Sequence, residues 1–209
     1  MPLDKKPKMY NLRNNLSIKE NYENGLLPQR NSKDYFYQDE NYSCRSSLSS
    51  FNLSSENRRI LNKTQPFSFQ KIPLSDFNFD NRTQKKISTW VKTLGWNFPT
   101  SSVKTVFTNH IFNYLYVWSD INKEICAYTI CYFDKNFSHV AYVFYNPIYA
   151  HQELPIRLAL EVVINSADLN LSYCYLGRFN PDTKLGFYKR NFPGFEYFIK
   201  NQWMSYHKK

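Results

Sequence analysis

The hydrophobic period of the chain changes in its second half, and this change constrains the fold more than any other feature. Three extended runs rich in β-branched and aromatic residues, at 112–118, 124–133 and 138–145, are separated by short polar turns. From 154 to 167 the apolar residues follow a helical period, and 171–176 returns to a strand pattern. The sequence therefore predicts an antiparallel meander followed by a buried helix and a further strand.

A second helix is expected before the meander, over about 80–94, with Gly95 as its stop signal. The apolar residues that share one face of this helix at helical spacing are Ile87, Trp90, Val91 and Leu94. The basic residues on the opposite face are Arg82, Lys85, Lys86 and Lys92. The pattern indicates an amphipathic helix with a basic outer surface.

Weaker signals lie on either side of these elements. Ser54 or Ser55 can N-cap a short helix whose first turn carries Arg58 and Arg59. Runs near the C-terminal end, at 195–199 and 202–206, are compatible with one or two more strands. Together these elements predict an α/β (α+β) fold with a mostly antiparallel central sheet flanked by helices.

The composition supports a folded domain rather than a fibrous or disordered chain. Of the 209 residues, 42% are hydrophobic and 18% aromatic, and only 5 are glycine. We expect a flexible leader with a short helix at 1–27, an irregular N-terminal segment at 28–70 and the main domain at 71–209. No apolar run approaches the roughly 18 residues of a membrane helix, and the start lacks a secretory signal, so we expect a cytoplasmic protein with no membrane partner.

The charge of the chain favours a polyanionic partner such as RNA. Lysine and arginine number 27 against 17 acidic residues, which gives a net charge of +10. The excess is uneven, because residues 51–100 carry 8 basic and 3 acidic side chains (8 − 3 = +5) whereas residues 101–150 carry 3 of each. Basic side chains in 51–100 are therefore the first candidates for phosphate contacts.

The cysteines and histidines do not form a metal-binding pattern. The four cysteines, which we expect to be buried thiols, are Cys44, Cys126, Cys131 and Cys174. The four histidines are His110, His139, His151 and His207. No CxxC pair and no ligand spacing occurs among them, so we predict no bound metal.

The order of the elements, three strands, a helix and a strand, resembles the sheet of the GNAT acyltransferases. Acetyl-CoA-dependent GNAT enzymes place a glycine-rich phosphate loop between the last meander strand and the next helix, because backbone N–H groups must approach a pyrophosphate closely. Here that junction, residues 146–155, contains no glycine and two prolines. We therefore expect that coenzyme A is not the cofactor.

Five short motifs, in order, resemble the arginyl-tRNA protein transferases and their bacterial leucyl relatives. The N-terminal motif consists of Arg45, Phe51, Ser55, Arg58 and Arg59. The C-terminal motifs are Phe144-Tyr145-Asn146-Pro147, Tyr173-Cys174-Tyr175-Leu176-Gly177, Tyr188-Lys189 and Asn191-Phe192-Pro193. The chain departs from that family in two places, because Cys44 alone stands for a cysteine cluster and Asn146 replaces an Asp.

This resemblance implies transfer of an aminoacyl group from tRNA to a protein or peptide N-terminus, with aminoacyl-tRNA as donor and no further cofactor. The ester is already activated, so catalysis requires positioning, removal of an ammonium proton and stabilisation of an oxyanion. The candidate catalytic residues are Tyr145, Asn146, Tyr175, Tyr188 and, as a general base, Glu161. The candidate tRNA-binding residues are Arg45, Arg58, Arg59, Lys85, Lys86 and Lys189.

Plainer interpretations stand beside these assignments. Most of the 17 tyrosines in such a chain are packing residues, and the basic side chains also fit a solvated surface. Two other functions remain open: a non-catalytic relative that binds RNA or protein, and a small-molecule N-acyltransferase that uses another activated donor.

Overall fold

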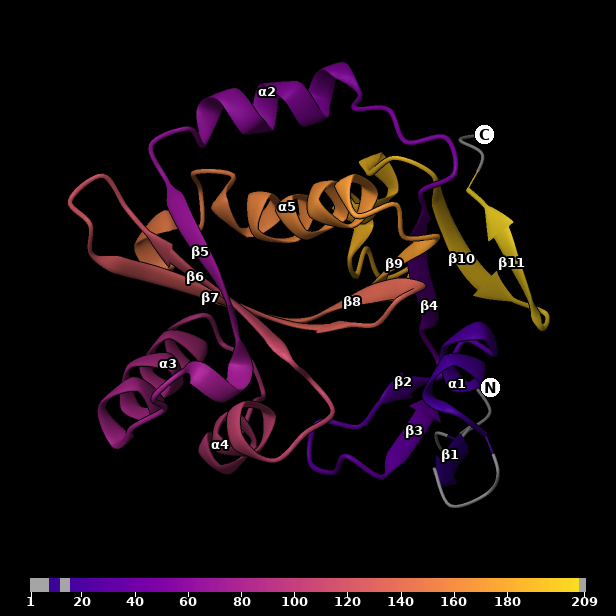
Figure 1. Cartoon of the computed structure of the whole chain (residues 1–209), viewed down its shortest axis with the longest axis horizontal. Helices are drawn as coiled ribbons and strands as arrows, with labels where there is room; N and C mark the ends of the chain where they lie inside the picture. Colours follow the sequence, from indigo (N-terminus) through magenta and orange to yellow (C-terminus); the bar gives the residue numbers. More distant parts are fainter. Residues whose placement is uncertain (1–7, 12–15, 207–209) are drawn as a thin grey trace.

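The computed structural model describes residues 8–11 and 16–206 and contains one large mixed sheet with helices on both faces (Figure 1). Its eight strands lie in the spatial order β11 (Gln202–Ser205), β10 (Phe195–Ile199), β4 (Tyr42–Ser47), β9 (Tyr173–Phe179), β8 (Phe137–Tyr145), β7 (Ile125–Phe133), β6 (Tyr114–Ser119) and β5 (Ser68–Pro73). All neighbours are antiparallel except β8 and β9, which are parallel. The expected α/β class with a mostly antiparallel sheet is confirmed.

The helices form layers above and below this sheet. On one face, α5 (Leu154–Asp168) packs against the strands and α2 (Ser55–Lys63) lies outside it, whereas α3 (Asn81–Thr93) and α4 (Thr100–Thr108) cover the other face (Figure 1). Short 3-10 turns occur at η1 (Leu74–Asp76), η2 (Pro147–Tyr149) and η3 (Phe187–Asn191). Side chains of both faces are buried, which is the reason why β7 is an almost continuous apolar run.

A small N-terminal unit adds to the second face. It consists of α1 (Ile18–Glu23) and a three-stranded sheet of β1 (Lys8–Asn11), β3 (Tyr35–Gln38) and β2 (Leu27–Pro28). Tyr22 and Phe36 of this unit are fully buried and pack with Phe137 and Tyr175 of the large sheet. The rest of the expected leader, residues 1–7 and 12–15, lies outside the described residues, as does His207.

Several local predictions are confirmed. The helices at 81–93 and 154–168 and the three meander strands lie within two residues of the expected bounds. Gly95 adopts φ +70° and ends α3 in a Schellman motif, in which the N–H of Trp96 donates to Val91 O at 3.0 Å and that of Gly95 donates to Lys92 O at 3.0 Å. Ser54 is the N-cap of α2, and the four cysteines are buried free thiols.

Other elements differ from the expectation. The strand expected to end at Gly177 continues to Phe179, because β4 pairs with it to that point. Strands β4 and β5 and helix α4 lack a clear periodic signal in the sequence. β4 lies inside the sheet although it contains polar residues, because its buried Ser43 and Ser46 donate hydrogen bonds to the backbone oxygens of Gly25 and Pro193.

No helix in the described part of the chain is both long and apolar enough to cross a bilayer.

Candidate functional site

The central sheet opens between its two parallel strands. β8 and β9 are paired only at Phe137 with Tyr173, Ser138 with Cys174 and His139 with Tyr175. Beyond these pairs β8 continues to residue 145 beside β7, and β9 continues to residue 179 beside β4. The facing edges of β8 and β9 therefore have no partner strand there and form a wedge in the middle of the sheet.

A cavity of about 220 Å³ occupies this wedge. Its walls come from residues 140–143 of β8 and 176–178 of β9, with Ala159 of α5 at the back. The side chains with polar groups that line it are Tyr37, His139, Tyr142, Arg178, Tyr188 and Lys189. Unpaired strand edges beside several titratable groups are the arrangement expected of a binding or catalytic site.

His139 stands at the point where the two strands separate. The hydroxyl of Tyr22 and His139 Nδ1 share a hydrogen bond of 2.8 Å, while Nε2 has no hydrogen-bond partner among the described residues. Burial lowers the pKa of His139 to about 3, and the charges of Lys189 and Arg178 act in the same direction. The imidazole is thus neutral at pH 7, and its Nε2 is available to a molecule in the cavity.

Tyr188 and Lys189 enter the wedge from η3. Burial raises the pKa of Tyr188 far above its usual value and lowers the pKa of Lys189. The Lys189 ammonium donates to Arg178 O at 2.8 Å. The turn requires Gly186, because its φ is +62° and a Cβ there would lie 2.5 Å from Arg178 O. This turn therefore holds the neutral hydroxyl of Tyr188 and the side chain of Lys189 against the cavity.

The other candidate catalytic residues are dispersed. Tyr145 and Asn146 lie at the far end of β8, where the Tyr145 ring meets Trp96 edge to face at 5.6 Å and Asn146 Oδ1 accepts from Ile148 N. Tyr175 is buried in the cluster beneath the N-terminal unit. Glu161 on α5 pairs with Arg157 at 2.5 Å and lines no described cavity, although burial raises its pKa. Only Tyr188 of the five reaches the wedge.

Two of the residues expected to contact tRNA, Arg45 and Arg59, already bind other side chains of the protein. Arg45 is 6% exposed, its Nε lies 2.8 Å from Glu196, and its guanidinium lies between the rings of Tyr173 and Trp203 at 3.7 and 4.1 Å. Little of Arg45 is therefore exposed, and the phosphate contact expected there stays a prediction. Arg59 forms a two-bonded pair with Glu56, with both distances 2.7 Å.

The remaining basic candidates lie in different places. Arg58 donates to the backbone oxygen of Leu53, and Lys86 donates to Ile125 O at 2.8 Å. Lys85 is exposed on α3. Lys189 lines the wedge. Of the six, Lys85 has its charge directed to solvent without a described partner.

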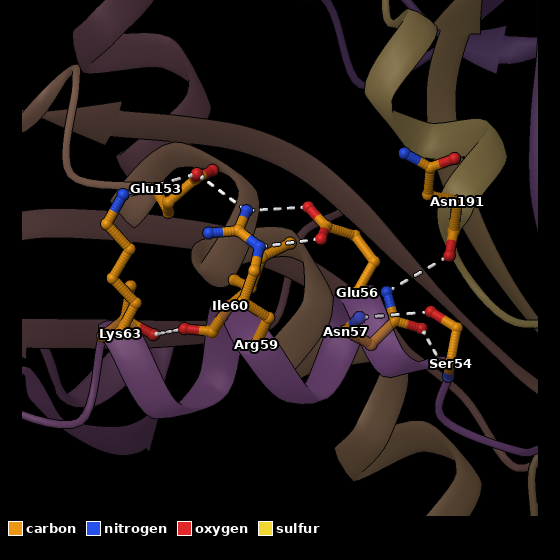
Figure 2. Close-up of polar contacts among 9 residues, drawn as sticks. Ser54, Glu56, Asn57, Arg59, Ile60, Lys63, Glu153 and Asn191 are labelled. Carbon is orange, nitrogen blue, oxygen red and sulfur yellow. Dashed lines mark hydrogen bonds and ion pairs between the residues drawn. The ribbon is translucent and has the colours of Figure 1, made fainter.

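Side chains of helix α2 contact Glu153 at the N-terminal end of α5 (Figure 2). Glu153 immediately precedes α5 with φ +62°, and its carboxylate lies 2.9 Å from Arg59 and 3.7 Å from Lys63. Asn57 Nδ2 donates to Asn191 O at 3.1 Å, which connects α2 to the end of η3. An acidic side chain and its ion pairs thus occupy the N-terminal end of α5, where the helix dipole would otherwise favour an anion.

The sequence analysis assigned no role in a site to His139, Tyr22 or Trp96. A histidine within an apolar strand was a signal for the first, since polar residues are rarely buried without a partner. The partner of His139 lies 117 residues away and had no local signal.

Within the described ranges, no group of three or more His, Cys, Asp or Glu residues could hold a metal ion.

No family model and no curated protein matches the chain. It is similar in structure to the C-terminal domain of a putative lysylphosphatidylglycerol synthetase from Agrobacterium fabrum, at 11% identity over 70% of this chain and 49% of that one, with a TM-score of 0.49. It is also similar to L-PGS from Bacillus licheniformis, at 13% identity over 66% and 46% of the two chains, with a TM-score of 0.45.

A third similar structure is an aminoglycoside acetyltransferase from an uncultured soil metagenomic sample. It is 10% identical over 69% of this chain and 97% of that one, with a TM-score of 0.42. The chain spans about half the length of the first two structures. At these identities the similarities show neither a family nor an activity.

Proposed function

We propose that the protein is an acyltransferase that moves an aminoacyl group from tRNA to an amine, with a protein or peptide N-terminus as the acceptor. The observation that carries this proposal is the wedge between β8 and β9, in which His139, Tyr188 and Lys189 face a cavity beside unpaired strand edges. The resemblance of the motifs to aminoacyl-tRNA-protein transferases supports the choice of donor.

The groups in the wedge suit transfer from an ester to an amine. The amine nitrogen attacks the ester carbonyl, a C–N bond forms, and the C–O bond to the ribose breaks. The neutral hydroxyl of Tyr188 can donate its proton to the departing ribose oxygen and take up the proton that the amine loses, so that Tyr188 ends unchanged. Backbone N–H groups on the open edge of β8 can stabilise the oxyanion, while neutral His139 orients the amine through Nε2.

The N-terminal end of α5 supports a donor other than coenzyme A. A diphosphate there would meet the Glu153 carboxylate and displace Arg59 and Lys63 from it. Placing like charges together in this way costs free energy. The excess of positive charge on the chain, +10, favours a polyanionic donor that approaches elsewhere.

A transfer assay tests the proposal. The protein is incubated with a mixture of charged tRNAs and a panel of peptides with free N-termini, and the peptides are analysed for the mass of an added amino acid. A parallel reaction contains acetyl-CoA and the same peptides. An aminoacyl mass shift that disappears with Tyr188→Phe and persists with Tyr114→Phe is the expected result. Acetylation without aminoacylation would contradict the donor, and binding of tRNA without any transfer would favour the non-catalytic alternative.

A further inference from the structure

Two further hollows share lining residues with the cavity in the wedge or with each other. A middle hollow of about 370 Å³ shares Tyr37 and residues 141–143 with the wedge and adds Arg30, Trp96 and Phe98. An outer groove of about 660 Å³ shares Trp96 and Phe98 with the middle hollow. It follows α3 and the start of α4 on the helical face opposite α5 (Figure 1). The shared lining residues therefore place the three hollows next to one another, from the wedge to the surface groove.

The wedge, the middle hollow and the outer groove together are called the path below. The outer part of the path is positively charged. The segment 81–108, which includes α3 and α4, contains no acidic residue. Its basic residues are Arg82, Lys85, Lys86, Lys92 and Lys104. Lys85 and Lys92 line the groove, Arg30 lines the middle hollow, and none of the three forms an ion pair within the described part of the chain. The path thus offers unneutralised cations to a ligand.

Trp96 lies where the groove meets the middle hollow. Its side chain is 39% exposed, and the Schellman motif at the end of α3 and the edge-to-face contact with Tyr145 hold it in place. Arg30 supports the neighbouring Phe98, since its guanidinium lies 5.3 Å from that ring and donates to Asn97 O at 2.8 Å. A fixed, partly exposed indole in the groove that Lys85 and Lys92 also line suits the stacking of an unpaired base.

We propose that this path binds the single-stranded 3′ end of an acylated RNA. Lys85 and Lys92 contact its phosphates, Trp96 stacks on a base near the end, and the terminal ester reaches the wedge. The inference rests on the proposed function, because it assigns to that site the route by which its donor enters. It adds that the donor is recognised by its unpaired end and not by a duplex alone.

Direct binding of RNA tests the path without any transfer. The probes are a fluorescent RNA hairpin with a short unpaired 3′ end and the same hairpin with a blunt end, measured by anisotropy. Trp96→Ala should weaken binding of the first hairpin by about 5- to 150-fold, as expected when one base no longer stacks on an aromatic ring. Phe69→Ala is the matched control, because Phe69 is also 39% exposed but lies on β5.

The salt dependence tests the two lysines. Lys85→Ala with Lys92→Ala should reduce the slope of log affinity against log salt by about 1.4 in magnitude, about 0.7 for each phosphate that the protein no longer neutralises. Lys104→Ala, an exposed lysine of α4 that does not line the groove, should leave it unchanged. Circular dichroism and thermal unfolding verify that each variant is folded.

The possible outcomes separate this inference from the proposed function. Equal binding of both hairpins, or equally weakened binding in the Trp96 and Phe69 variants, would overturn the path even if aminoacyl transfer is observed. Selectively weakened binding in the Trp96 and lysine variants would support the path even if no transfer is detected, and would then leave the enzyme assignment as the part that fails.

Discussion

The hydroxyl of Tyr22 and Nδ1 of His139 meet at 2.8 Å on the floor of the wedge, although 117 residues separate them in the chain. Tyr22 belongs to α1 and is fully buried against Phe36, Phe137 and Tyr175. The N-terminal helix therefore determines the orientation of an imidazole in the central sheet. A side chain from outside the meander thus completes the site.

Removing the Tyr22 hydroxyl should destabilise the protein. Tyr22→Phe keeps the ring but leaves His139 Nδ1 buried without a partner, which we expect to lower the free energy of unfolding by about 1–3 kcal/mol. Urea unfolding measures the change. Tyr114→Phe, whose hydroxyl makes no described hydrogen bond, should change stability by less than about 0.5 kcal/mol. Equal stability of both variants would mean that the hydrogen bond contributes little.

The stability of the fold should depend on pH through His139. Its folded-state pKa of about 3 lies below the ordinary 6.5, so between these values the unfolded chain binds one more proton than the folded protein. The free energy of unfolding should therefore rise with pH from about 3 to about 6.5, by at most about 1.4 kcal/mol per pH unit from this group, and level off above.

The variant His139→Asn isolates this contribution. Asparagine retains a polar group near the Nδ1 position but does not titrate, so the slope of stability against pH in that window should decrease. Part of the slope should remain, because burial also lowers the pKa of His110. Denaturant titrations at several pH values test this, and an unchanged slope would show that His139 is not the group responsible.

Tyr188→Phe should impair turnover more than binding. The ring still packs against Phe192, whereas the hydroxyl that donates to the departing oxygen is absent. For an assisting proton donor we expect kcat to fall by about 10²- to 10⁴-fold with KM little changed. Tyr114→Phe again serves as the control. A rise in KM at constant kcat would instead assign Tyr188 to donor binding.

Arg59→Ala should leave the salt dependence of RNA binding unchanged. Its guanidinium is already paired with Glu56 and Glu153, so it offers little charge to a phosphate (Figure 2). Lys92→Ala should reduce the slope of log affinity against log salt by about 0.7 in the same assay. If Arg59→Ala produced the larger reduction, the RNA-facing surface would lie over α2 rather than α3.

Two glycines allow a matched test of the turn that carries Tyr188. Gly95 and Gly186 both have positive φ, but an added Cβ meets no atom within 4 Å at Gly95 and lies 2.5 Å from Arg178 O at Gly186. Gly95→Ala should cost about 1–2 kcal/mol of stability from the left-handed backbone alone. Gly186→Ala should cost more and reduce transfer, because η3 must move away from β9. Similar costs in urea unfolding would contradict this difference.

The meander, the two long helices and the cap residues could be predicted from the sequence because each depends on neighbours along the chain. Ile87, Trp90 and Val91 recur at the period of a helix, and Gly95 can adopt the left-handed conformation that ends it. The buried thiols and the excess of basic residues in 51–100 also follow from residue type alone.

The site depends on contacts between distant segments, which only the tertiary structure determines. Tyr22 reaches His139 because α1 packs on the face of the sheet that α3 and α4 also cover. Arg45 is buried because β4 lies between β9 and β10. Arg59 is neutralised by Glu153, a partner 94 residues away. The wedge itself arises where β8 and β9 separate. Strand pairing and charge pairing across such distances leave no local periodicity in the sequence. The sequence therefore predicts the helices and strands but not which of them come into contact.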